Sequence, residues 1–213
     1  MTQIKICGIT LADDAARVSD AGADFIGLNF WPKSRRYLAP ERAPIVAAAA
    51  RGAGAALLVG VFVDAGVDEI TSVMAMVDLD VIQLHGGELA EDLIAVAAAT
   101  RRPVWKAIAV GAPCDIERLE TWPADAILLD TPSPAKGGTG EIFDWALAKE
   151  ARQRSPARLL VLAGGLRTDN VAGAISAVQP WAVDVATGVE AAPGIKDASK
   201  VTAFIAAVRA AST

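Results

Sequence analysis

The feature that most constrains this chain is the regular return of short apolar runs, each followed by a segment that favours a helix. We expect strands near residues 3–7, 24–29, 57–62, 80–84, 104–108, 126–130, 159–163 and 182–186. We expect helices near residues 11–21, 41–51, 67–77, 88–99, 115–121, 143–152, 168–178 and 197–211. Continuous apolar strands that alternate with helices indicate a parallel sheet covered on both faces. Eight such units predict an α/β fold of the (β/α)8 TIM-barrel type.

The spacing of the strands favours one barrel over residues 1–213. The second half repeats the pattern of the first, since residues 57–59 and 159–161 both read Leu-Leu-Val at equivalent positions. No linker rich in Pro, Ser or Gly divides the two halves. The alternative is an open doubly wound sheet, which needs a topological switch point and usually has fewer strands.

Composition excludes several classes of partner. The net charge of -5 and the scattered Lys and Arg residues give no basic stripe for nucleic acid, so an anionic substrate would need local cations. Residues 44–63 are mostly apolar, but Arg51 lies near their centre, and a buried helix followed by a strand explains them better than a membrane span. Cys7 and Cys114 are far apart, and no spacing suggests a zinc site or a disulfide framework. The N-terminus lacks the apolar core of a signal peptide, so we expect a cytoplasmic protein, either a monomer or a homodimer.

The first predicted strand places a thiol where barrel enzymes keep their chemistry. Because strand side chains alternate, Ile4 and Ile6 are expected to face the helices, and Lys5 and Cys7 the barrel interior. Cys7 then lies at the carboxyl end of the strand, where barrel active sites form. The structural alternative is that Cys7 is a small buried hydrophobic residue.

Polar side chains also lie at the ends of later strands. Gln83 and His85 share one face of the fourth strand, and His85 is the only histidine. Asp130 ends the apolar sixth strand, a position suited to a general acid. Each has a structural alternative, because a lone histidine is often structural and Asp130 can cap a loop or pair with Lys106. Lys106, on the fifth strand, is either part of the site or a buried cation paired with an acid.

Loops at the same end of the barrel supply candidate anion-binding groups. Residues 30–37 form a basic, aromatic loop in which an arginine can bind a carboxylate at two points; the alternative is a solvated charged loop. Barrels often bind phosphate between the turns after strands seven and eight. We therefore expect phosphate binding by Gly164, Gly165, Thr187 and Gly188. Residues 136–140 are rich in glycine and can close over a ligand.

Taken together, these segments resemble the phosphoribosylanthranilate isomerase family of tryptophan biosynthesis. The matching segments, in chain order, are residues 5–10 (KICGIT), 32–37 (PKSRRY), 59–63 (VGVFV), 83–86 (QLHG), 128–131 (LLDT), 137–140 (GGTG) with 143–145 (FDW), 163–166 (AGGL), 183–185 (VDV) and 188–190 (GVE). They run from the first strand to the last, and residues 5–10 and 128–131 are the most specific. The departure is at Ala186 and Thr187, where family members more often have two serines; Thr187 keeps a hydroxyl.

The resemblance implies an Amadori rearrangement of an aminoaldose phosphate, with no metal or redox cofactor. Asp130 would be the general acid, Cys7 the general base, and Arg36 the partner of the substrate carboxylate. The sugar would be bound by Lys5, Gln83, His85 and Asp184. We add the hypothesis that Lys5, on the same face of the strand as Cys7, lowers the pKa of the thiol, whose free value is about 8.5.

Two other functions compete with this one. The histidine-pathway aminoaldose isomerase resembles it, but that family typically has an aspartate at the position of Cys7 and needs two phosphate grips. A non-catalytic barrel that binds a phosphosugar is the second alternative. The presence of both Cys7 and Asp130 argues against lost chemistry.

Overall fold

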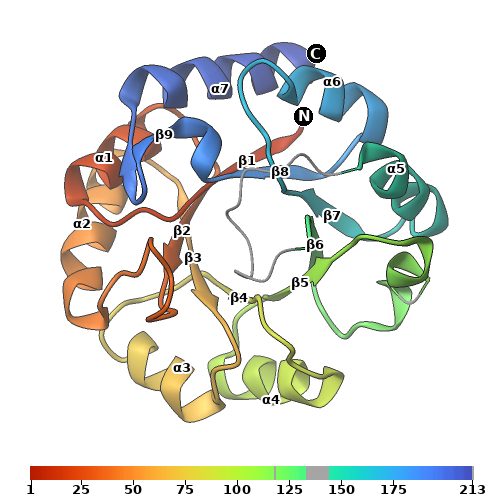
Figure 1. Ribbon diagram of the computed structural model, residues 1–213. Helices are drawn as coiled ribbons and strands as arrows, with labels where there is room; N and C mark the ends of the chain where they lie inside the picture. The colour runs from red at the N-terminus through yellow and green to blue at the C-terminus, as the bar shows by residue number, and fades with distance from the viewer. Residues whose placement is uncertain (118, 133–143, 213) are drawn as a thin grey trace.

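Eight parallel strands form a closed barrel in the computed structural model, which describes residues 1–117, 119–132 and 144–212 (Figure 1). In the order of both chain and barrel they are β1 (Gln3–Cys7), β2 (Phe25–Asn29), β3 (Leu57–Phe62), β4 (Val81–Leu84), β5 (Val104–Ala109), β6 (Ala126–Asp130), β7 (Leu159–Leu162) and β8 (Ala182–Val185). β8 pairs with β1, with Ile4 opposite Val183, and this pairing closes the barrel. The predicted (β/α)8 fold is therefore confirmed.

A ring of helices surrounds the barrel (Figure 1). The helices are α1 (Ala12–Asp20), α2 (Ala43–Ala53), α3 (Val67–Met74), α4 (Ala90–Thr100), α5 (Trp145–Arg154), α6 (Val171–Val178) and α7 (Ala198–Ala211). Shorter elements are the 3-10 helices η1 (Pro40–Arg42) and η4 (Thr187–Val189) and a hairpin of β9 (Glu190–Ala192) and β10 (Ile195–Lys196). The apolar residues 44–63 lie in α2 and β3, as predicted. Within the described ranges, every helix is too short or too polar to cross a membrane.

The predicted helix over residues 115–121 is wrong. Two 3-10 helices lie there instead, η2 (Pro113–Ile116) and η3 (Leu119–Thr121). The segment lies between Pro113 and Pro123 and is too short to stabilise successive α-helical turns. Ile116 and Leu119 are nevertheless buried against the barrel, so these turns cover the sheet as a helix would.

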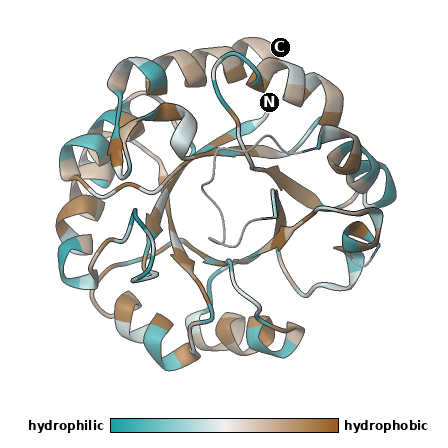
Figure 2. Cartoon of the chain, viewed as in Figure 1, coloured by the Kyte–Doolittle hydropathy of each residue, from teal (hydrophilic) through white to brown (hydrophobic). Residues whose placement is uncertain are grey.

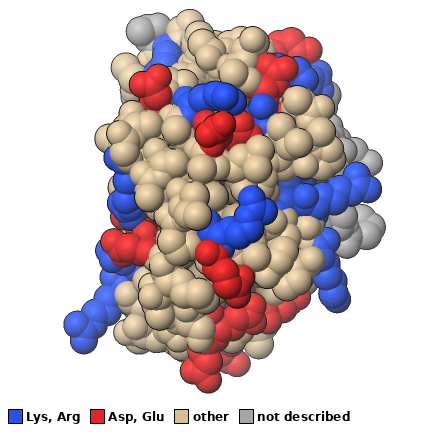
Figure 3. Space-filling view, turned by 90° about the vertical axis from the view of Figure 1, so that its left-hand side faces the viewer, with Lys and Arg blue, Asp and Glu red and all other residues tan. Residues whose placement is uncertain are grey.

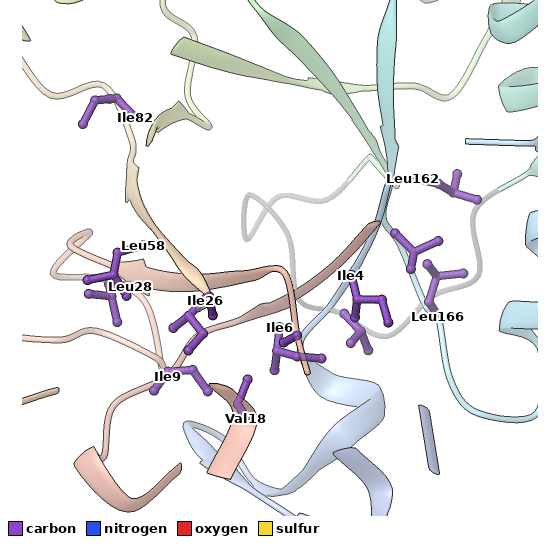
Figure 4. Close-up of a cluster of buried hydrophobic side chains, with 14 of the residues drawn as sticks. Ile4, Ile6, Ile9, Val18, Ile26, Leu28, Leu58, Ile82, Leu162 and Leu166 are labelled. Carbon is purple, nitrogen blue, oxygen red and sulfur yellow. The ribbon is translucent and has the colours of Figure 1, made fainter. Parts of the chain in front are cut away.

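The outer core lies between the strands and the helices. Ile4 and Ile6 point outward from β1 and pack with Ile9, Val18 and other aliphatic side chains (Figure 4), as the alternation predicted. Figure 2 shows the same division, with apolar strands inside and polar colour mainly on the outer sides of the helices. On the flank in Figure 3, basic side chains are scattered among acidic and uncharged ones and form no stripe.

A second, smaller core fills the amino-terminal end of the barrel interior. Phe25 and Trp105 meet edge to face with ring centroids 5.0 Å apart, and Trp181 lies within 5.7 Å of both rings. Aromatic rings of this size exclude water from that end. Apolar side chains therefore close the amino-terminal end of the barrel interior.

Candidate active site

A cavity of about 780 Å³ opens at the carboxyl ends of the strands. The predicted site residues that line it are Cys7, Arg36, His85, Asp130, Gly164, Gly165, Asp184, Thr187 and Gly188. Lys5 and Gln83 are fully buried, and neither reaches the lining. The structure therefore brings together residues from six strands and their following loops at one end of the barrel.

Cys7 occupies its place because Gly27 has no side chain. The two residues are paired across β1 and β2. A Cβ atom at Gly27 would lie 2.7 Å from the Cys7 Sγ atom and 3.0 Å from the Cys7 Cα atom. Non-bonded heavy atoms normally lie about 3.5–4.0 Å apart, so a side chain at this position would displace the sulfur.

An ion pair lies next to Cys7 in the barrel interior. The Lys5 Nζ atom donates a hydrogen bond to the Asp184 Oδ1 atom at 3.0 Å, and Lys5 has no exposed surface. Burial is the largest single effect and lowers the pKa of Lys5, but Asp184 and Cys7 together outweigh it, and the pKa is raised. Lys5 therefore remains a cation.

The pKa of the Cys7 thiol is raised above its ordinary value. Burial is the largest cause, because it disfavours the thiolate, and the charge of Asp184 adds to the increase. The charge of Lys5 and its hydrogen bond lower this pKa, in the direction predicted. Lys5 therefore acts on the thiol as hypothesised, and the net increase arises because burial and Asp184 together outweigh the lysine.

Asp130 faces His85 at the end of β6. The His85 Nε2 atom lies 3.3 Å from the Asp130 Oδ2 atom. On its other side, the Gln83 amide nitrogen lies 2.9 Å from His85 Nδ1, and in this orientation the imidazole proton of a neutral His85 is on Nε2. The Gln83 Oε1 atom is buried without a hydrogen-bond partner among the described residues. The three side chains form a connected row that ends at Asp130.

Arg36 is held at the rim of the cavity by a residue to which the sequence analysis gave no role. Its Nε and Nη2 atoms each lie 2.7 Å from one carboxylate oxygen of Glu190. Nη2 also donates to the Thr187 hydroxyl at 3.0 Å. Lys196 adds a second cation, with its Nζ atom 3.0 Å from Glu190 Oε1.

Two turns form the predicted phosphate-binding part of the cavity. Gly164 and Gly165 have positive φ angles of 82° and 64°, a conformation that favours glycine. A Cβ atom at Gly188 would collide with the Leu166 carbonyl oxygen, so the two turns pack directly against each other. The Asn170 side chain donates to the Gly165 carbonyl at 3.0 Å and fixes the first turn.

Lys106 lies outside the cavity. It points to the outer side of β5, between the inward-facing Trp105 and Ala107. Its Nζ atom lies 2.6 Å from Glu88 Oε2 and 2.8 Å from the Gly86 carbonyl oxygen. Of the two roles predicted for Lys106, the buried cation paired with an acid is therefore confirmed.

The glycine-rich residues 136–140 and Phe143 fall outside the described residues. Of the matching segment there, Asp144 and Trp145 are described, and the Asp144 carboxylate caps α5 by accepting from the Ala146 N–H at 2.9 Å. Within the part of the chain that the structure describes, no group of His, Cys, Asp and Glu side chains is arranged to hold a metal ion.

Comparison with known proteins identifies the family. Residues 4–207 match the family model described as N-(5'phosphoribosyl)anthranilate (PRA) isomerase. The chain belongs to the N-(5'-phosphoribosyl)anthranilate isomerase family. It is 43% identical to the isomerase of Geobacter sp. (strain M21), over 97% of each protein, and 40% identical to that of Herminiimonas arsenicoxydans, over 99% of this chain and 94% of the relative.

Solved isomerase structures agree. The phosphoribosyl anthranilate isomerase from Thermotoga maritima superimposes with a TM-score of 0.89 at 42% identity, covering 99% of this chain and all of the other. A phosphoribosyl anthranilate isomerase in complex with reduced 1-(o-carboxyphenylamino)-1-deoxyribulose 5-phosphate superimposes with a TM-score of 0.86 at 40% identity, with the same coverage. Membership of this isomerase family confirms the predicted activity in tryptophan biosynthesis.

Proposed function

We propose that this chain converts N-(5-phosphoribosyl)anthranilate into 1-(2-carboxyphenylamino)-1-deoxyribulose 5-phosphate, with Asp130 as general acid and Cys7 as general base. The Asp130 carboxyl group protonates the ring oxygen as its bond to C1 breaks, and the nitrogen lone pair forms a protonated imine. The Cys7 thiolate then removes the proton from C2, and the electrons of that bond form an enolamine. Protonation at C1 and loss of the hydroxyl proton give the ketone.

One observation carries this proposal. Cys7 and Asp130 end two strands that are not neighbours in the barrel, and both line the same cavity. A sugar between them would present different atoms to the acid and to the base, as the two proton transfers require. The Cys7 pKa is raised, so the base is present mainly as the thiol at neutral pH, and Lys5 favours the reactive thiolate.

Binding of the substrate uses groups around this pair. Arg36 would hold the anthranilate carboxylate through Nη1, because Nε and Nη2 already bind Glu190, and a bond from a guanidinium to a carboxylate is charge-assisted. Backbone N–H groups of the turns at Gly164, Gly165, Thr187 and Gly188 would hold the phosphate. Asp184, His85 and Gln83 would shape the sugar site, and Lys5 would hold the Asp184 carboxylate in place through their ion pair.

The proposal is tested by following the loss of anthranilate-derivative fluorescence with the purified protein. Both the phosphoribosyl anthranilate and the histidine-pathway aminoaldose are offered as substrates. We expect turnover of the first and little of the second, because the sequence predicts one phosphate-binding site and the histidine-pathway substrate needs two. Equal turnover of both would favour a dual-substrate enzyme, and binding without turnover would favour the non-catalytic barrel.

Assembly and location stay predictions. A structural neighbour from Thermotoga maritima is described as monomers of a dimeric isomerase, at a TM-score of 0.86 and 40% identity, covering 99% of this chain and all of the other. For this chain, sedimentation velocity will decide between a monomer and a homodimer. A cytoplasmic location suits an enzyme of amino-acid biosynthesis, and fractionation of the source cells tests it.

A further inference from the structure

The Glu190 carboxylate lies at the centre of a buried cluster of donors. Its Oε1 atom accepts from Arg36 Nε at 2.7 Å, from Lys196 Nζ at 3.0 Å and from the Gly194 N–H at 3.1 Å. Its Oε2 atom accepts from Arg36 Nη2 at 2.7 Å. The side chains of Glu190 and Lys196 are 5% and 2% exposed, so these bonds form away from solvent, where they are strongest.

These contacts fix the guanidinium of Arg36 in one orientation. The two parallel bonds to Glu190 set its plane, and the Thr187 hydroxyl holds Nη2 from another side. The stem of Arg36 packs so closely on Gly8 that a Cβ atom there would collide with Arg36 Cδ. Arg36 Nη1 takes part in none of these bonds, and the residue lines the cavity. The nitrogen left for a ligand is therefore held in place before the ligand arrives.

Charge alone does not explain the cluster. Burial lowers the pKa of Lys196, although Glu190 opposes this decrease. With Lys196 protonated, one carboxylate and two cations leave a net charge of about +1, whereas the same site without Glu190 would carry about +2 and attract an anion more strongly. Burial opposes ionisation of Glu190, but Arg36 and Lys196 outweigh it and lower its pKa, so the acid remains charged. Glu190 therefore weakens the attraction of this site for an anion. If Glu190 contributes to substrate binding, its contribution must come from the geometry that it imposes.

We propose that Glu190 is a positioning residue that aims Arg36 at the substrate carboxylate and so selects substrates that carry a carboxyl group on the aromatic ring. This inference rests on the proposed function, because it requires Arg36 to bind that carboxylate. The gain in affinity for the carboxylate comes from preorganisation, since an arginine that is already ordered loses less side-chain entropy when it binds.

Calorimetric titration with two unreactive ligands tests the proposal. The first is reduced 1-(o-carboxyphenylamino)-1-deoxyribulose 5-phosphate, and the second is the same compound without the carboxyl group. The wild-type protein should prefer the first by about tenfold or more, the range of a charge-assisted hydrogen bond. Glu190→Gln should remove most of this preference and leave the affinity for the second ligand within about twofold, because only the aim of Arg36 is lost.

Further variants separate positioning from charge and from folding. Glu190→Asp keeps the charge but shortens the side chain, and it should lose the preference as Glu190→Gln does. Adding Arg36→Met to either variant should cause no further loss. Glu88→Gln is the matched control, since Glu88 is also a buried acid paired with a lysine, and it should keep the preference.

Three results of these titrations would overturn the inference. A preference that is unchanged or larger in Glu190→Gln would overturn the inference and assign the site to simple charge attraction. Equal losses for both ligands would overturn it in favour of a structural role for the β9–β10 hairpin. A wild-type protein without a preference would overturn the role of Arg36 in the proposed function, and this inference with it.

Discussion

Replacing Gly27 with alanine tests the position of the Cys7 sulfur, the proposed general base, by adding a single methyl group. The new Cβ atom would lie 2.7 Å from Cys7 Sγ and 3.0 Å from Cys7 Cα. Normal contact is about 3.5–4.0 Å, so the sulfur must move by about 1 Å. Because the backbone of β1 is also too close, a rotation of the thiol alone cannot relieve the overlap.

The cost to the reaction follows from that displacement. A misplacement of about 1 Å at a reacting atom lowers the rate by about a hundredfold. We expect this loss in kcat, with KM changed little, because Arg36 and the two turns that we propose to bind the ends of the substrate lie on other elements. Overpacking of this kind also destabilises the fold by about 1–3 kcal/mol.

The assay is steady-state fluorescence of substrate consumption, combined with thermal unfolding. Gly52→Ala is the control, since Gly52 lies in α2 and a Cβ atom there would have no neighbour within 4 Å. It should keep wild-type turnover and gain about 0.5–1 kcal/mol in the free energy of unfolding. Wild-type kcat in a folded Gly27→Ala protein would refute the reasoning, because the reaction would then tolerate a displaced sulfur.

Three further predictions concern the roles of single residues. Cys7→Ala and Asp130→Ala should each lower kcat by about a hundredfold or more with unfolding unchanged, and near-normal turnover would remove that residue from its role. Arg36→Met should mainly raise KM, because it removes a binding group, and unchanged steady-state constants would count against the assignment. In a Cys114→Ser background, which removes the exposed second thiol, the rate of alkylation by iodoacetamide should rise with pH through the raised pKa of Cys7. Lys5→Met should move this rise to still higher pH, since Lys5 lowers that pKa, and identical curves would reject any coupling.

Much of the barrel could be predicted because strand alternation is a local rule. It correctly placed Ile4 and Ile6 against the helices and left Lys5 in the interior. The same rule also decides Lys106, which follows the inward-facing Trp105 and must therefore face outward. The sequence alone leaves Lys106 open, because it does not show that the neighbouring Trp105 faces the barrel interior.

The pKa of Cys7 could not be predicted in the same way. The direction of the pKa shift depends on a balance between burial, Lys5 and Asp184, and the sequence places only Lys5 next to Cys7. Asp184 reaches the same point from the last strand and binds the lysine whose charge was expected to act on the thiol. Competing effects of similar size require the distances, which only the folded chain supplies.

The role of Glu190 lies between these two cases. Arg36 and Glu190 are far apart in sequence, yet closure of the barrel makes β1 the neighbour of both β2 and β8. The loops that follow β2 and β8 therefore flank the end of β1. The closed barrel predicts that these two loops lie near each other, but it does not predict which of their side chains meet. Nor does it predict the two-point geometry that leaves Nη1 for the substrate, because that geometry depends on the close packing of the Arg36 stem against Gly8.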